Sequence, residues 1–204
     1  MDAVFLLIRA YESAQTMGAE KLLITTGRDT LPRDRKRAME QFMKSMDRLM
    51  PVLSDIDVVL ETGDRTVDAR QLLGPTDEAI DATLEIRKKY PNFYLTLDTS
   101  HLAQLGEDAE ASIEKGFSLS NHVHLASCIL TPGHSLYGDK HPFFSNEDGL
   151  FSDARLRNIY NRVVEKANEE GKDLLVGHEV IDRSGERLGG LMRAIEESPW
   201  FFTE

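Results

Sequence analysis

Apolar and polar residues follow two different periods along this chain. In the longer segments apolar side chains recur every three or four positions, and this spacing predicts helices at residues 1–17, 34–52, 75–89, 108–115, 153–169 and 185–197. Between them lie short, nearly continuous apolar runs typical of buried strands, at residues 21–26, 57–61, 93–98, 122–126 and 173–179. Strands that alternate with helices predict right-handed βαβ units and one parallel sheet. We therefore expect an α/β fold of about five βα units, in a single domain over residues 1–204.

The helix predicted at residues 34–52 carries an unusual apolar stripe. The stripe consists of Met39, Phe42, Met43, Met46 and Leu49, which share one helical face. Methionine adapts its shape to irregular gaps between packed elements, so such a stripe is more often core than a surface for a cofactor. We expect this face to pack into the core.

One connection, residues 127–150, is much longer than the others. Long connections without regular structure are usually either functional or disordered. This one contains Tyr137, Phe143 and Phe144, and aromatic residues are not typical of disorder. It also carries two potential metal ligands, Asp139 and His141. We expect a structured loop that covers a site.

Composition narrows the class of protein. With 204 residues, of which 41% are hydrophobic, the chain is long enough for one buried core. No apolar run approaches the roughly eighteen residues of a membrane span, and the N-terminus does not read as a signal peptide, so we expect a cytoplasmic protein. A single cysteine, Cys128, leaves nitrogen and oxygen as the ligands for any metal. The net charge of −11 disfavours a nucleic-acid partner. The obvious basic cluster, interpreted as a solvated helix start, is Arg28, Arg33, Arg35, Lys36 and Arg37.

Potential metal ligands lie at the ends of the predicted strands. Glu61 ends one strand and Asp98 the next, a pair of histidines lies in the fourth, and a His-Glu pair ends the fifth. In a βα-barrel the carboxyl ends of the parallel strands converge on one face, where active sites lie. Carboxylate and imidazole ligands suit Mn²⁺, Mg²⁺, Co²⁺ or Zn²⁺. The pattern predicts a divalent metal site on this face.

The order of these residues resembles that of a known superfamily. The stretches concerned are Leu60-Glu61, Leu97-Asp98-Thr99-Ser100-His101, His122-Val123-His124-Leu125, Gly138-Asp139-Lys140-His141 and His178-Glu179. Together they resemble the xylose isomerase-like TIM-barrel superfamily, which includes sugar and sugar-phosphate isomerases and epimerases and also endonuclease IV. The resemblance runs over about residues 21–197.

The resemblance implies a role for each matching residue. Glu61, Asp98, His124 and Glu179 would hold the metal, and Glu61 and Glu179 would also transfer protons to and from a sugar through an enediolate. His101 would lie beside them and bind substrate or a further metal. Asp139 and His141 match a pair that completes a multinuclear site in the nuclease branch, although related loops also occur in isomerases.

Two departures from the superfamily pattern affect this interpretation. A complete barrel of this type has eight strands, and the chain matches the last five, so the predicted barrel is incomplete. The chain would then be a fragment, a naturally short open barrel, or a subunit of a homo-oligomer whose neighbour covers the gap. Residues 24–29 also lack the histidine that endonuclease IV supplies before the Glu61 strand.

The absence of this histidine favours one of the possible functions over the others. The leading hypothesis is a metal-dependent isomerase or epimerase that acts on a small sugar or sugar phosphate, because this needs only the strand-end ligands that are present. The alternatives are an endonuclease IV-like metal-dependent phosphodiesterase, whose trinuclear site would be incomplete here, and a truncated relative without catalytic activity.

Overall fold

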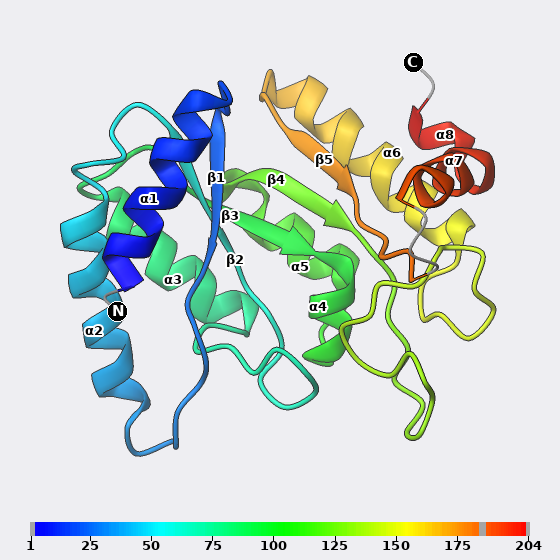
Figure 1. Cartoon of the computed structure of the whole chain (residues 1–204), viewed down its shortest axis with the longest axis horizontal. Helices are drawn as coiled ribbons and strands as arrows, with labels where there is room; N and C mark the ends of the chain where they lie inside the picture. Colours follow the sequence, from blue (N-terminus) through cyan, green and yellow to red (C-terminus); the bar gives the residue numbers. More distant parts are fainter. Residues whose placement is uncertain (1–2, 184–186, 203–204) are drawn as a thin grey trace.

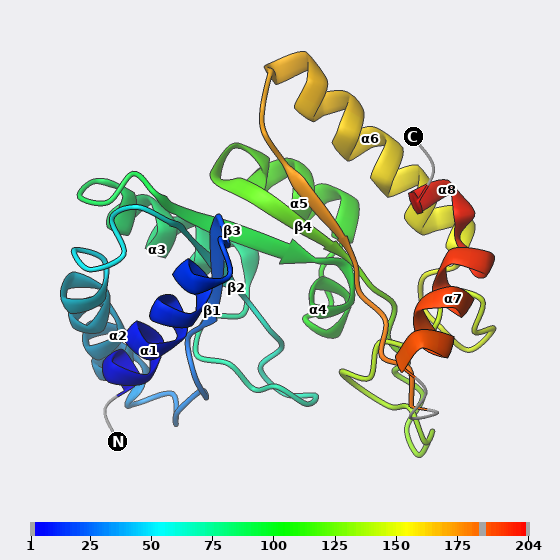
Figure 2. The same ribbon diagram turned by 45° about the horizontal axis from the view of Figure 1, so that its top comes forward.

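Five strands form one parallel sheet in the computed structural model, which describes residues 3–183 and 187–202. In spatial order they are β1 (Lys21–Thr25), β2 (Asp57–Glu61), β3 (Phe93–Asp98), β4 (Ser120–Leu125) and β5 (Leu175–His178). The sheet curls into part of a barrel, with β1 and β5 at its two edges (Figures 1 and 2). The predicted parallel sheet of five strands and the incomplete barrel are confirmed.

Helices connect the strands as the alternating pattern predicts. The longer ones are α1 (Ala3–Thr16), α2 (Arg35–Leu49), α3 (Thr76–Arg87), α5 (Ala109–Gly116), α6 (Asp153–Glu170) and α7 (Arg187–Glu197). Of the predicted helices, residues 1–2 and 185–186 lie outside the described residues. Three short elements were not predicted because they are too short to show a period: α4 (Thr99–Gln104), the 3₁₀ helix η1 (Phe117–Leu119) and α8 (Pro199–Phe202).

The core consists of two apolar clusters on the helix-covered side of the sheet. The first joins α1 and α2 to β1 and β2, and it includes Phe42, Met46 and Leu49, so the predicted packing of the methionine stripe is confirmed. The second joins β3 and β4 to α5 and α6, with Leu97 and Val123 at its centre. The two clusters hold neighbouring strands firmly, which fixes the positions of the strand ends.

Sheet register brings the carboxyl ends of four strands close together, with each candidate ligand level with its neighbour or two residues beyond it. Thr25 pairs with Glu61 on β1 and β2, and Asp98 pairs with His124 on β3 and β4. β5 is shorter than predicted and ends at His178, but the next amide, that of Glu179, still donates to the carbonyl of Leu125 at 2.9 Å. Glu179 therefore continues the ladder, and all four predicted strand-end ligands lie on one edge of the sheet.

The long connection between β4 and α6 is structured, as predicted. The amide of Gly138 donates to the carbonyl of Ile129 at 2.9 Å, and that of Leu150 donates to Cys128 at 2.9 Å. Phe144 is buried in the second core cluster. In both views this yellow-green loop lies at the edge of the sheet where the strands end (Figures 1 and 2).

The two edge strands leave apolar side chains exposed on the inner face of the partial barrel. Leu23 of β1 shares a face with Thr25, and Leu175 of β5 pairs with His122, on the face that also carries His124. Both leucines are exposed. Coverage of this face by a second subunit stays a prediction. None of the described helices is long and apolar enough to cross a membrane.

Candidate metal centre

The four predicted ligands meet around one nitrogen atom. Nδ1 of His124 lies 2.8 Å from Oε1 of Glu61, 2.8 Å from Oε2 of Glu179 and 3.7 Å from Oδ2 of Asp98. One ligand atom from each of the four residues lies within 4.8 Å of all the others. The structure thus brings together residues that are far apart in the sequence, one from each of four consecutive strand ends.

This arrangement suits a cation better than a network of hydrogen bonds. A ring nitrogen carries at most one proton, and of the three carboxylates only Glu61 is placed to form a hydrogen bond with Nδ1 of His124. Oδ2 of Asp98 and Oε2 of Glu179 are buried without any hydrogen-bond partner. Buried carboxylate oxygens without partners are costly unless a cation compensates them. Three carboxylates and an imidazole form the donor set that Mn²⁺, Mg²⁺, Co²⁺ and Zn²⁺ accept.

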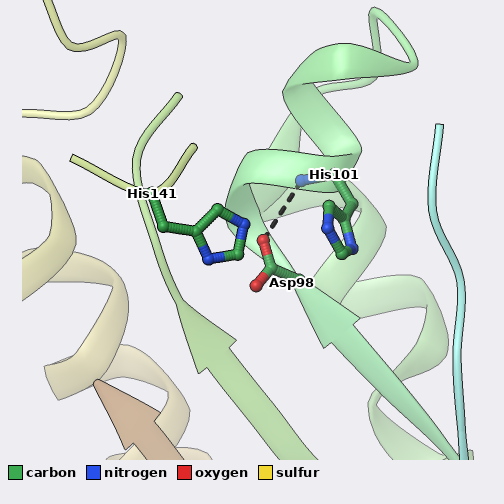
Figure 3. Close-up of side chains that lie close together, drawn as sticks. All are labelled: Asp98, His101 and His141. Carbon is green, nitrogen blue, oxygen red and sulfur yellow. Dashed lines mark hydrogen bonds between the residues drawn. The ribbon is translucent and has the colours of Figure 1, made fainter. Parts of the chain in front are cut away.

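The two carboxylate oxygens of Asp98 make different contacts. Oδ1 accepts hydrogen bonds from the backbone amide of Ser100 at 2.7 Å and from that of His101 at 3.1 Å, and so caps the start of α4. Figure 3 shows the bond to His101 as a dashed line. Oδ2 is the oxygen that faces His124. The residue therefore serves both as a helix cap and as a candidate ligand.

A second group of side chains lies beside the first. Nδ1 of His101 lies 2.8 Å from the carbonyl of Thr62 and must donate to it, because a carbonyl has no proton to give. Nε2 of His101 then faces Oδ1 of Asp139 at 3.0 Å, and Nε2 of His141 approaches the same oxygen at 2.6 Å. Atoms of Asp98, His101 and His141 also lie within 4.8 Å of one another, close enough for a further ion (Figure 3).

The carboxylates control the protonation of His124. Burial lowers the pKa of an imidazole, but the two carboxylates beside it, those of Glu179 and Glu61, together outweigh burial and raise the pKa of His124 to about 10. Burial raises the pKa of Asp98. Without a metal, His124 therefore carries a proton at neutral pH, and an incoming cation has to displace it.

The second group shows the same balance of burial and charge. Burial opposes the charged imidazoles, but Asp98 and Asp139 raise the pKa of His101 to about 10, and Asp139 and Glu179 do the same for His141. Burial raises the pKa of Asp139, but its hydrogen bonds with the two imidazoles bring that pKa well below its usual range. Asp139 therefore stays a carboxylate between two rings.

The chain is similar to a known protein family in sequence and to solved structures in fold. A family model described as a xylose isomerase-like TIM barrel matches residues 2–198. The chain belongs to that family. The resemblance noted from the strand-end motifs is confirmed, while the roles of the individual residues stay predictions. No curated protein matches the sequence at a significant level.

Solved structures agree with the family assignment at low sequence identity. The apo 3-keto-D-glucoside 4-epimerase YcjR from E. coli has a TM-score of 0.68 and 15% identity, over 97% of this chain and 70% of that one. The AP endonuclease of family 2 from Brucella melitensis has a TM-score of 0.64 and 22% identity, over 96% and 65%. The IolI protein with a bound zinc atom has a TM-score of 0.64 and 13% identity, over 98% and 70%. Part of each of these structures thus has no counterpart in this chain.

Two contributors to the site were not among the predicted residues. Ser100 donates its hydroxyl proton to Oδ1 of Asp98 at 2.6 Å. Asp68, in the loop after β2, accepts from the backbone amide of Asp139 at 3.2 Å and from Nζ of Lys140 at 2.6 Å. Ser100 lies inside the Asp98–His101 motif, so its position in the sequence could have indicated a role. Nothing in the sequence pairs Asp68 with a loop about seventy residues away.

Proposed function

We propose that this protein is a metal-dependent isomerase or epimerase of a sugar or sugar phosphate. The observation that carries the proposal is the approach of two glutamates, from strands on either side of β4, to one imidazole nitrogen: Glu61 and Glu179 each lie 2.8 Å from Nδ1 of His124. Family membership and the similarity to a solved sugar epimerase support it.

The proposed ligands are Glu61, Asp98, His124 and Glu179. A divalent cation held by them would polarise a sugar carbonyl and stabilise the negative charge of an enediolate. The zinc atom in the similar IolI structure supports a metal in this fold. The donor set by itself does not select among Mn²⁺, Mg²⁺, Co²⁺ and Zn²⁺, since geometry and availability decide that choice.

Glu61 and Glu179 are the proposed acid and base. They come from β2 and from the end of β5, with β3 and β4 between them, so a substrate at the strand ends has one carboxylate on each side. One carboxylate removes the proton beside the carbonyl, and the other returns a proton to the opposite face or to the neighbouring carbon. Glu179 is the more open of the two, with a side chain 36% exposed against 11% for Glu61.

The second group is proposed to bind the substrate or a second ion. His101 is oriented by the carbonyl of Thr62, which leaves Nε2 on the side of Asp139. Asp139 and His141 offer further polar atoms on the same side. In an isomerase these groups would hold the sugar hydroxyls and restrict its orientation.

Proton transfer gives a direct test of the proposal. The purified chain is loaded with each of the four metals and incubated with ketoses and ketose phosphates in D₂O, and deuterium incorporation next to the carbonyl is measured by NMR. We expect exchange in the unaltered protein and a loss on the order of 10²–10⁴ in Glu61→Gln and Glu179→Gln. Metal content is measured in each variant, which separates a lost ligand from a lost base.

Glu40→Gln is the matched control, because Glu40 is an exposed residue of α2 and belongs to neither group of candidate ligands. It should exchange at the unaltered rate. A chain that binds no metal and exchanges no proton on any sugar would refute the proposal and leave a non-catalytic relative as the explanation.

One observation favours a second candidate, a metal-dependent phosphodiesterase. The group formed by Asp98, His101 and His141 is close enough for an additional ion, and one similar structure is an AP endonuclease. Cleavage of a duplex with a single abasic site, measured with the same metal-loaded protein, distinguishes this activity from isomerisation.

A further inference from the structure

Ser100 lies at the junction between the two groups of side chains. It is the second residue of α4, and none of its surface is exposed. Its hydroxyl contacts Oδ1 of Asp98 at 2.6 Å and Nε2 of His141 at 3.1 Å. One small buried side chain therefore touches both a candidate metal ligand and a residue of the long loop.

The hydroxyl adds to an unequal distribution of hydrogen bonds between the two carboxylate oxygens of Asp98. Oδ1 accepts three hydrogen bonds, from the amides of Ser100 and His101 and from the Ser100 hydroxyl. Oδ2 accepts none and is buried. Three donors on one oxygen prevent the carboxylate from turning and leave Oδ2 as the oxygen that faces His124.

The same hydroxyl orients His141. It has one proton, which it donates to Oδ1 of Asp98, so its contact with Nε2 of His141 is one in which the ring N–H donates. Nε2–H also faces Oδ1 of Asp139 at 2.6 Å. Nδ1 of His141 is then the nitrogen left without a hydrogen-bond partner, on the side of Glu179 Oε1 at 3.4 Å.

We propose that Ser100 is a positioning residue that holds Asp98 with a single oxygen toward the metal and ties His141 to the same centre. The inference rests on the proposed metal site. Ser100 is not one of the candidate ligands and acts through Asp98 and His141. The predicted consequence of removing its hydroxyl is a rotated Asp98 carboxylate and a weaker, altered metal site, with little change in the fold.

The chain offers a closely matched control. Ser120, at the start of β4, is as fully buried as Ser100, and its hydroxyl also makes a single donated hydrogen bond, to the carbonyl of Gly116 at 3.1 Å. Ser100→Ala and Ser120→Ala therefore remove the same atom from equally buried positions. They should lower the unfolding temperature of the metal-free protein by similar amounts.

The two variants should differ in metal binding. Affinity for Mn²⁺ is measured by competition with a chelator, and the coordination geometry is followed by the visible absorption of bound Co²⁺. For Ser100→Ala we expect an affinity about 10–100-fold weaker and a changed Co²⁺ spectrum. Ser120→Ala should keep the unaltered affinity and spectrum. Ser100→Cys, which keeps the volume but is a poor donor, should follow Ser100→Ala and provides the test if the alanine variant does not fold.

Each outcome of these measurements supports or refutes the positioning role of Ser100. Unaltered Mn²⁺ affinity and an unaltered Co²⁺ spectrum in Ser100→Ala or Ser100→Cys would overturn the role of Ser100 while the metal site stands. Failure of the unaltered protein to bind either metal would overturn both this inference and the proposed function. Equal losses of affinity in the Ser100 and Ser120 variants would show a general structural effect and refute the positioning role.

Discussion

The two groups of candidate ligands are held in place by different means. Glu61, Asp98, His124 and Glu179 lie at the ends of paired strands, so the backbone ladder sets their spacing. His101, Asp139 and His141 instead owe their positions to side-chain hydrogen bonds centred on Asp139. The first group should therefore keep its geometry when the loops change locally, whereas the second depends on every hydrogen bond in its network.

Backbone conformation shows the same contrast. His141 has φ of 40°, in the left-handed region that residues with a side chain rarely adopt. Its carbonyl accepts from the amide of Ile181 at 2.9 Å, which anchors this strained residue to the segment that follows β5. Such strain costs on the order of 1–3 kcal/mol and persists only where surrounding contacts enforce it. The strand-end ligands carry no such strain.

The largest expected effect comes from removing a ladder-held ligand. Asp98→Ala should weaken Mn²⁺ binding more than about 100-fold. This exceeds the effect of losing a hydrogen bond to a ligand, because the variant removes a buried candidate ligand itself. Isothermal titration calorimetry measures this. The variant also loses a helix cap, worth about 1 kcal/mol of folding free energy.

The variant Asp108→Ala separates the loss of a helix cap from the loss of a candidate ligand. Asp108 caps α5 by accepting from the amide of Ala111 at 2.8 Å, and it belongs to neither group of candidate ligands. It should lose a similar amount of stability while its metal affinity stays the same. If both cap variants lose the same affinity, the ladder-held group is not a metal site.

Proton competition is expected to give the next largest effect. Burial lowers the pKa of His124, but Glu179 and Glu61 raise it to about 10, so the imidazole is protonated below that pH when no metal is bound. A cation must displace this proton, and the affinity should therefore rise by about tenfold per pH unit from pH 6 to pH 9 for each proton released. Calorimetry in two buffers of different ionisation enthalpy counts the protons. An affinity independent of pH in this range would contradict the placement of His124 as a ligand.

Much of the ladder-held group was predictable from the sequence. Each of its residues ends or follows an apolar run, and parallel strands bring their carboxyl ends to one edge, so convergence follows from topology. The choice of His124 over His122 did not follow from periodicity, since both lie on one face of β4; it came from the resemblance to a family. In the structure His124 contacts the carboxylates, while Nδ1 of His122 is buried without a partner.

The network of the second group was not predictable in the same way. Asp139 and His141 were identified as potential ligands, but the hydrogen bonds that connect them to His101, Ser100 and Asp68 depend on how two loops pack together. Loop conformation follows from side-chain contacts with no period in sequence. The short helix α4 was missed because its 6 residues are too few to show a helical period, and its Asp98 cap also reads as a strand-end ligand.

Metal removal should reveal how far the ladder-held group contributes to stability. A ligand that binds the folded state stabilises it by about 2.7 kcal/mol at a concentration 100 times its Kd. For a chain of this size that corresponds to about 2–4 °C in Tm per kcal/mol. Differential scanning fluorimetry with added Mn²⁺ and with excess EDTA measures the shift. Asp98→Ala should show a shift of at most about 1–2 °C, because about 0.4 kcal/mol remains after a 100-fold loss of affinity, and Asp108→Ala should show the full shift.

The smallest effect is expected from a link that belongs to the loops alone. Asp68 is exposed and connects the loop after β2 to Asp139 and Lys140. Asp68→Ala should leave Mn²⁺ affinity within about twofold, because the strand-end ligands do not depend on it, and it should change stability by less than about 1 kcal/mol. Hydrogen exchange of residues 137–141 should nevertheless increase, since the amide of Asp139 loses its acceptor. Asp77→Ala, which removes an exposed ion pair with Lys115 elsewhere, is the control and should leave that exchange unchanged. A large loss of metal affinity in Asp68→Ala would show that the loop network holds the strand-end ligands as well, and the contrast between the two groups would fail.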